Sequence, residues 1–165
     1  MYYSNDQEMS WESEIQQDEH SLIKEGDYNG VVINYERAYH NGSERMPPCK
    51  KAVVTIRLDT EEGPRDFETT LFLHKKTEWV LSGFFRAIGL KKHGERLKMD
   101  WSKVKGSKLR VHMGIRTYKG RDGEEHTANN IDRYYDYDPS FFPADPVWLQ
   151  EAMEINETEP FDEVF

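Results

Sequence analysis

The sequence predicts a mainly β domain between two acidic regions. Five segments carry the β-branched and aromatic residues typical of strands, and one segment between the third and fourth changes to helical spacing. Residues 1–19 hold six acids and residues 134–165 hold nine, and neither region has a Lys or Arg. We therefore expect an acidic arm over residues 1–21, a folded domain over residues 22–138, and a short helix with an acidic tail over residues 139–165.

Residue type and alternation predict the first three strands. Residues 30–39 are rich in Val, Ile and Tyr, and the Asn-Gly and Pro-Pro pairs after them indicate a loop. Residues 51–58 and 66–74 alternate with the period of two expected of a half-buried strand. The side chains expected at the core or its rim are Val31, Ile33, Tyr35 and Tyr39, then Val54, Ile56 and Leu58, then Phe67, Thr69, Leu71 and Leu73.

A helix and two further strands complete the predicted order. Residues 77–90 have apolar side chains at helical spacing, with Thr77 as the expected N-cap and Gly89 as the expected C-cap. A strand over residues 106–118 and a turn over 119–123 lead to a fifth strand over 125–135. In the fourth strand we expect Leu109, Val111, Met113 and Ile115 on the inner face. The order β-β-β-α-β-β is typical of a five-stranded barrel of the OB type, with the helix between strands three and four at the end of the barrel.

The middle of the chain is basic, although the whole chain has a formal net charge of -9. Residues 71–121 hold 14 Lys and Arg against three acids, and such a field attracts polyanions. Binding of single strands also needs exposed rings, on which each stacked base contributes about 1–3 kcal/mol. The residues expected to bind nucleic acid are Lys50, Lys51, Arg57, Phe72, Lys108, Arg110, His112, Arg116, Tyr118 and Lys119.

Three segments of the domain resemble a known family. The phrases IKEGDYNGVVINYERAY, TEWVLSGFFRAIGL and GSKLRVHMGIRTYKGRDG resemble phage and prophage OB-fold single-stranded-DNA-binding proteins, over roughly residues 22–135. The resemblance implies a protein that coats and protects single-stranded DNA in phage-type replication or recombination, in the cytoplasm of a bacterial host. It offers no catalytic motif.

The acidic tail is similar to the tails of bacterial and phage single-strand-binding proteins, which recruit replication and repair enzymes. The residues expected to bind such partners are Pro160, Phe161, Asp162, Glu163, Val164 and Phe165. The bacterial form ends in Pro-Phe, whereas the last pair here is Val164-Phe165, so the identity of the partner stays open. Such a tail can also occupy its own DNA groove when DNA is absent.

A short helix is predicted just before the tail, with Asp145 as its N-cap and Pro146 in its first turn. Its apolar residues Trp148, Leu149 and Met153 need a surface on which to dock. That surface is either the barrel or a second subunit, so a homo-oligomer is one of the two expectations.

The motifs of common enzyme and metal sites are absent from the sequence. It has no phosphate-binding Gly-rich loop, no His-Glu-x-x-His and no Cys pair, and its six histidines lack ligand spacing. We expect no enzymatic activity, cofactor or metal. The single Cys49, the lack of a signal-peptide pattern and the lack of any run of 18 apolar residues predict a soluble cytoplasmic protein without membrane contact.

An alternative function belongs to a different class. The acidic regions themselves can be the functional surface of a protein-interaction module or DNA mimic that inhibits a DNA-binding enzyme. The basic middle of the chain argues against this alternative, because a mimic presents carboxylates from its folded body. It gains support if the basic residues are dispersed around the fold.

Overall fold

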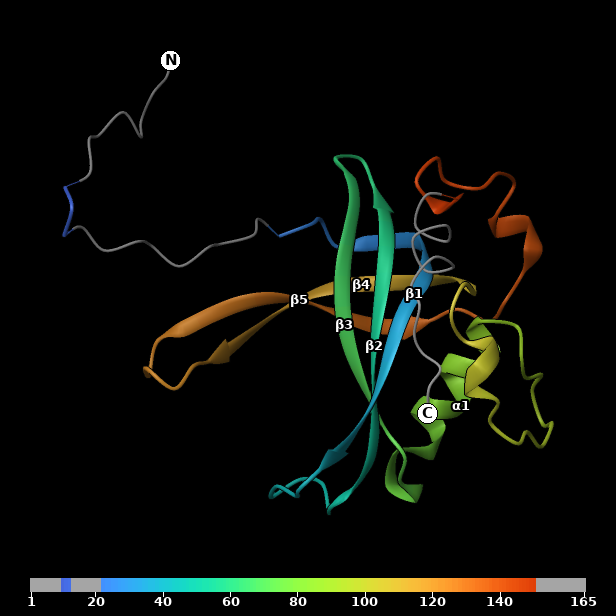
Figure 1. Cartoon of the computed structure of the whole chain (residues 1–165), viewed down its shortest axis with the longest axis horizontal. Helices are drawn as coiled ribbons and strands as arrows, with labels where there is room; N and C mark the ends of the chain where they lie inside the picture. Colours follow the sequence, from blue (N-terminus) through green and yellow to red (C-terminus); the bar gives the residue numbers. More distant parts are fainter. Residues whose placement is uncertain (1–9, 13–21, 151–165) are drawn as a thin grey trace.

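Five strands and one α-helix form the computed structural model, which describes residues 10–12 and 22–150 (Figure 1). The strands are β1 (Gly26–His40), β2 (Cys49–Thr60), β3 (Gly63–Phe72), β4 (Lys108–Lys119) and β5 (Glu125–Tyr134). The helix α1 (Glu78–Ala87) lies between β3 and β4 in the chain, and the short 3-10 helices are η1 (Lys75–Thr77), η2 (Trp101–Lys103) and η3 (Pro139–Phe141). The predicted mainly β fold is confirmed.

All five strands belong to one antiparallel sheet in the order β3-β2-β1-β4-β5. The edge strands β3 and β5 share no backbone pairing in this order, so the sheet is open and the closed barrel stays a prediction. The side chains of Thr69 in β3 and Tyr134 in β5 lie close to each other, so the two edges approach at this point. Figure 1 shows the β4–β5 hairpin reaching away from the rest of the sheet.

The hydrophobic core lies between the inner face of the sheet and α1. Val54, Ile56 and Leu58 of β2 are fully buried, as the predicted alternation requires. Leu109, Val111 and Met113 of β4 join the same core, together with Phe84, Phe85 and Ala87 of α1. The rings of Phe84 and Tyr134 meet edge to face at 5.7 Å, which packs the helix against the last strand.

The helix begins after the predicted N-cap residue, but its C-cap is Ile88 rather than the predicted Gly89. Thr77 is its N-cap residue, although the Thr77 hydroxyl donates to the Phe72 carbonyl rather than accepting from the helix. Gly89 follows the helix with a φ of +82°, a conformation that favours glycine. The Leu90 and Gly89 amides donate back to the Phe85 and Arg86 carbonyls at 3.0 and 3.2 Å, so two of the last carbonyls are satisfied.

A β-bulge in β1 changes the faces expected for that strand. The register with β2 shifts between Val32 and Asn34, so Val31 lies opposite Arg57 on the outer face while Val32 lies opposite Ile56 in the core. Tyr35, beyond the bulge, lies opposite Val54 and again faces the core side. Simple alternation cannot place both segments correctly, because one extra residue reverses every following side chain.

The prediction for Ile115 is wrong. Its side chain is 45% exposed, because β4 beyond Gly114 runs out into the projecting hairpin and leaves the core. The last described helical residues of the predicted short helix are Leu149 and Gln150, and Met153 lies outside the described residues.

Candidate nucleic-acid interface

The outward face of the sheet, opposite the core, brings six of the predicted binding residues together. Strand register places them in rows, since residues directly opposite one another in neighbouring strands project from the same face. The six residues are Lys51, Arg57, Phe72, Lys108, Arg110 and His112. Lys51 lies opposite Phe72, and Val31 lies between Arg57 on one side and Lys108 on the other.

The other four predicted residues lie elsewhere. Lys50 is exposed on the core side of the sheet, where it lies opposite Tyr39 of β1. Arg116, Tyr118 and Lys119 belong to the exposed half of β4, in the projecting hairpin. There the Tyr118 ring is 46% exposed and stacks on His126 at 5.7 Å. The ten predicted residues therefore divide between the outward face, the hairpin and the core side.

Acidic and amide groups pair with the cations of the outward face. Arg57 donates to both carboxylate oxygens of Asp66, at 2.7 and 3.1 Å, in a bidentate ion pair. Arg110 donates to the Asn29 amide oxygen at 2.8 Å and lies 3.9 Å from Asp27. Lys108 forms an ion pair with Asp145. The sequence does not indicate these partners, because each lies on a different strand or segment from the cation with which it pairs.

A segment that we call the C-terminal strap, residues 139–149, lies over this face. The Arg110 guanidinium lies over the Phe141 ring at 5.5 Å. The Phe141 carbonyl accepts a hydrogen bond from the side-chain amide of Asn29 at 2.8 Å. The Arg57 guanidinium lies over the Trp148 ring at 5.6 Å. Trp148 thus docks on the sheet of its own chain, one of the two surfaces that the sequence left open.

The burial of Val31 agrees with the position of the strap. Val31 is 1% exposed although it lies on the outward face, away from the core cluster. Its neighbours across the sheet, Arg57 and Lys108, are the residues that contact Trp148 and Asp145. The middle of the predicted surface is therefore covered by the chain itself.

His112 lies among the carboxylates of Glu25, Asp27 and Asp132, at the β1–β4–β5 end of the outward face. Its Nδ1 lies 2.7 Å from Asp27 Oδ1, which also accepts from the Tyr135 hydroxyl at 2.8 Å. The hydrogen bond with Asp27 raises the pKa of His112, and the charges of Asp27, Asp132 and Glu25 act in the same direction. The same hydrogen bond lowers the pKa of Asp27.

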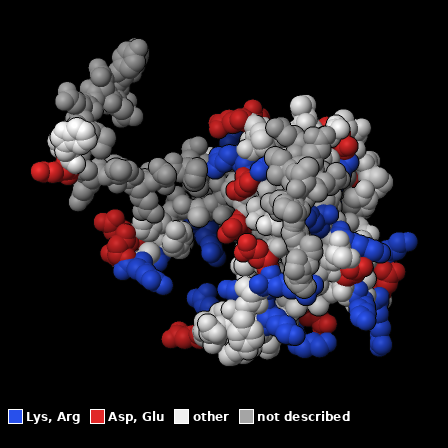
Figure 2. Space-filling model, in the orientation of Figure 1, with Lys and Arg blue, Asp and Glu red and all other residues white. Residues whose placement is uncertain are grey.

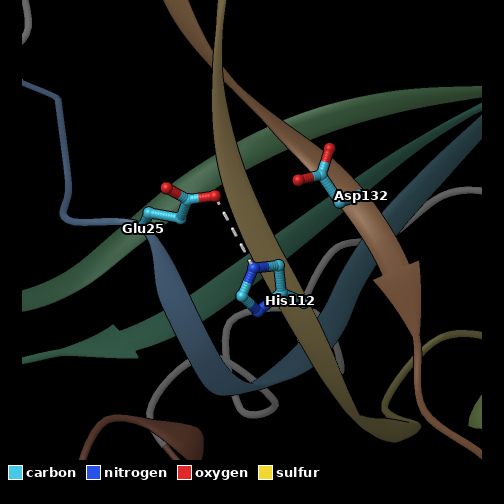
Figure 3. Close-up of side chains that lie close together, drawn as sticks. All are labelled: Glu25, His112 and Asp132. Carbon is cyan, nitrogen blue, oxygen red and sulfur yellow. Dashed lines mark ion pairs between the residues drawn. The ribbon is translucent and has the colours of Figure 1, made fainter.

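Glu25, His112 and Asp132 are drawn in Figure 3, with the His112 ring and both carboxylates facing one another. Their potential ligand atoms all lie within 4.8 Å of one another, so among the described residues this is a group that could hold a metal ion. The raised pKa of His112 means that a proton competes with a cation for the ring nitrogens, and His112 already pairs with Asp27 and Glu25. We therefore interpret the group as an ion-pair cluster.

Phe72 is half-buried at the other end of the outward face. Its ring meets the His40 ring at 4.9 Å with an interplanar angle of 66°, so one side of a potential base platform already has a neighbour. Lys51, another predicted binding residue, lies opposite Phe72 across the β2–β3 ladder and places a cation next to this ring.

On the face drawn in Figure 2, the described basic residues do not form one uninterrupted patch. Figure 2 shows Lys and Arg on several parts of the visible face, with Asp and Glu between them. The tail residues Pro160, Phe161, Asp162, Glu163, Val164 and Phe165 lie outside the described residues.

A pocket that the sequence does not indicate lies on the core side of β1. It has a volume of about 490 Å³ and is lined by Arg37, Lys98, Met99, Asp100, Trp101 and Ser102. Arg37 and residues 98–102 lie far apart in the chain, so no local pattern brings them together.

Comparisons with known proteins give no match: neither a protein-family model nor a curated protein matches this sequence. In the part of the chain that the structure describes, no helix is both long and apolar enough to cross a membrane.

Proposed function

We propose that this protein binds single-stranded DNA through the outward face of its sheet, without catalysing a reaction. The observation that carries the proposal is the way in which the strap contacts this face. A chain segment carrying rings and a carboxylate lies across a row of cations, with Phe141 on Arg110, Asp145 on Lys108 and Trp148 on Arg57.

A single strand of DNA carries anions and aromatic rings in alternation, as the strap does. Phosphates can replace the Asp145 carboxylate at Lys108, because both are anions that pair with an ammonium group. Bases can replace the rings of Phe141 and Trp148, since every base has a π face on which a guanidinium stacks. The strap therefore has to leave for this part of the face to bind DNA.

The shape of the sheet supports an OB-type fold for the proposed binding domain. Three features are those expected of a barrel with one unpaired seam: the strand order β3-β2-β1-β4-β5, the helix after β3, and the approach of Thr69 to Tyr134 across the edges. The projecting hairpin, with Arg116, Tyr118 and Lys119, offers exposed cations and a ring at the side of the outward face. It extends the proposed contact beyond the strap.

The acidic tail completes the proposal. Its carboxylates and its apolar residues Phe161 and Phe165 suit a basic pocket with a hydrophobic floor on a replication or recombination protein. The protein would then coat DNA and recruit that partner in a phage-type process in the host cytoplasm.

The test is a fluorescence-polarisation titration of labelled oligothymidylate at two salt concentrations, with single-strand and duplex competitors. We expect binding that weakens steeply with salt and prefers single strands, because phosphate contacts release counterions. An absence of binding at low salt would overturn the proposal.

A protein-interaction module or acidic DNA mimic is the second candidate. The mixture of charges in Figure 2 and the carboxylates paired with Arg57 and Lys108 favour it. The same titration separates the two functions, because a mimic binds no oligonucleotide but competes with DNA for a DNA-binding enzyme.

A further inference from the structure

The pocket beside β1 is a second place where cations and a ring meet. Arg37 and Lys98 are exposed, and neither side chain forms an ion pair with any residue that the structure describes. On the outward face, in contrast, Arg57, Lys108 and Arg110 each have a carboxylate within 4 Å. The charges at the pocket are therefore available to an external anion.

Packing against the core fixes the ring of the pocket. Trp101 lies 5.6 Å from the Tyr35 ring and 5.3 Å from the Phe85 ring, centroid to centroid, so its orientation is set by buried neighbours. Asp100 Oδ1 accepts from the Ser102 amide at 3.1 Å, which holds the turn of η2. A ring held in this way needs little ordering when a base stacks on it.

The charge and size of the pocket suit one nucleotide. Its lining carries two cations, Arg37 and Lys98, against one acid, Asp100, whose carboxylate is already engaged with Ser102 and Lys103. A volume of about 490 Å³ lies within the usual range of about 300–1,000 Å³ for small-molecule sites. Two residues further along β1, on the same face, Tyr39 is 56% exposed and lies opposite the exposed Lys50.

We propose that this pocket binds one nucleotide unit, with its phosphate between Arg37 and Lys98 and its base against Trp101 and Met99. The proposal rests on the proposed function insofar as the unit belongs to a DNA strand, which would then pass on toward Tyr39 and Lys50. The strap does not cover this site with any described contact, so it is open while the outward face is occupied. The ligand is either a free nucleotide or one unit of a strand.

The direct test follows the Trp101 indole N–H resonance by NMR during titration with thymidine 5′-monophosphate. Trp79, which is 76% exposed on α1 and away from the pocket lining, is the control within the same molecule. The variant is Arg37→Gln/Lys98→Gln, and the matched control is Lys92→Gln/Arg96→Gln, which removes two exposed charges outside the lining.

We expect the nucleotide to shift the Trp101 resonance but not that of Trp79. The shift should be lost in Arg37→Gln/Lys98→Gln and kept in Lys92→Gln/Arg96→Gln. An unmoved Trp101 resonance, or equal shifts in the two variants, would overturn the proposal that the pocket binds a nucleotide.

Oligothymidylate titrations of the same variants separate the two sources of the ligand and the two proposals. If the nucleotide is part of a strand, Arg37→Gln/Lys98→Gln should bind the oligonucleotide more weakly, with a salt slope shallower by about 0.7 for the one lost phosphate contact. If the monophosphate shifts the Trp101 resonance of the wild type but the oligonucleotide does not bind, the pocket takes a free nucleotide. The proposed function is then wrong, while the pocket proposal stands. If the oligonucleotide binds while Trp101 never responds, the pocket fails and the proposed function stands.

Discussion

Single residues on the outward face act mainly through their electrostatic partners. His112 and Asp27 stabilise each other's charged form, which raises the pKa of His112 above its ordinary 6.5 and lowers that of Asp27 below its ordinary 3.8. The raised pKa of His112 contributes stability below pH 6.5 that is lost as the pH rises through its folded-state pKa. The lowered pKa of Asp27 contributes stability above pH 3.8 that is lost as the pH falls through its folded-state pKa.

Asp27→Asn should therefore lower the pKa of His112, because it removes the carboxylate that accepts from Nδ1. The His112 pKa is measured by NMR titration of the imidazole Cε1–H resonance. The variant should also lose more unfolding free energy at about pH 5 than at about pH 8.5, since only the lower pH lies in the window where both partners are charged. Glu68→Gln, which removes an exposed carboxylate from β3, is the control and should leave the His112 titration unchanged. An unchanged His112 pKa in Asp27→Asn would contradict the conclusion that Asp27 raises the pKa of His112.

The elements of the structure are held by close approaches that only some residues allow. Gly30 of β1 lies between β2 and β4, opposite Leu58 and Leu109. A Cβ at this position would lie 2.7 Å from Leu58 Cδ2 and 2.9 Å from the Arg57 carbonyl oxygen. The carbonyl belongs to the β2 ladder and cannot move without loss of pairing.

Gly30→Ala should destabilise the protein by about 1–3 kcal/mol, the usual cost of overpacking a core position. Urea unfolding followed by circular dichroism measures the change. Gly83→Ala in α1 is the matched control, because a Cβ there meets only Arg86 Nη2 at 3.9 Å. That control should be neutral or stabilising, since Ala favours helix over Gly by about 1 kcal/mol. Equal stability of the Gly30 variant and the wild type would contradict the tight β1–β2 approach.

The strap is the other element with a testable consequence. Trp148→Ala removes the half-buried ring under the Arg57 guanidinium, a cation–π interaction of at least about 0.5–1 kcal/mol. If the strap competes with DNA, oligothymidylate affinity should rise about two- to five-fold in the polarisation assay, the factor that this energy corresponds to. Val147→Ala changes the neighbouring side chain, which is 99% exposed, and should have no effect. Weaker binding by Trp148→Ala would mean that the ring itself contacts DNA.

The whole molecule combines a sheet that carries cations with segments that carry carboxylates. The two have opposite effects on a polyanion that approaches the protein. The chain has a formal charge of -9, but the described surface carries clusters of both signs (Figure 2). Acidic segments repel DNA at long range, whereas the cations of the sheet and hairpin attract it at short range. Salt screens both effects, so the balance depends on ionic strength.

Deletion of residues 162–165 should leave DNA affinity equal or higher and abolish recruitment of the replication or recombination partner. The reason is that two carboxylates and two apolar side chains are lost, which are the groups proposed to enter the partner's pocket. Polarisation titration measures the first effect, and pull-down of the host replication proteins measures the second. A clear loss of DNA affinity would count against a tail that acts only on partners.

Local patterns predicted much of the fold. The alternation of β2 and of β4 as far as Met113, the helix between Thr77 and Gly89, and the strand at residues 125–135 all agree with the structure. The sequence alone was sufficient for these elements, because alternation, helical spacing and caps depend on residues within a few positions of one another.

Only the tertiary structure decided how the candidate site is arranged. The β1 bulge turned Val31 outward, Asp66 and Asp145 came to Arg57 and Lys108 from other segments, and the strap covered the face that alternation had predicted to be open. Each of these features depends on strand register and on contacts between residues far apart in the chain. They depend on the free energy of the whole packed arrangement, which includes the burial of Val31, the pairing of the charges and the entropy cost of ordering the strap. No local sequence pattern contains that sum.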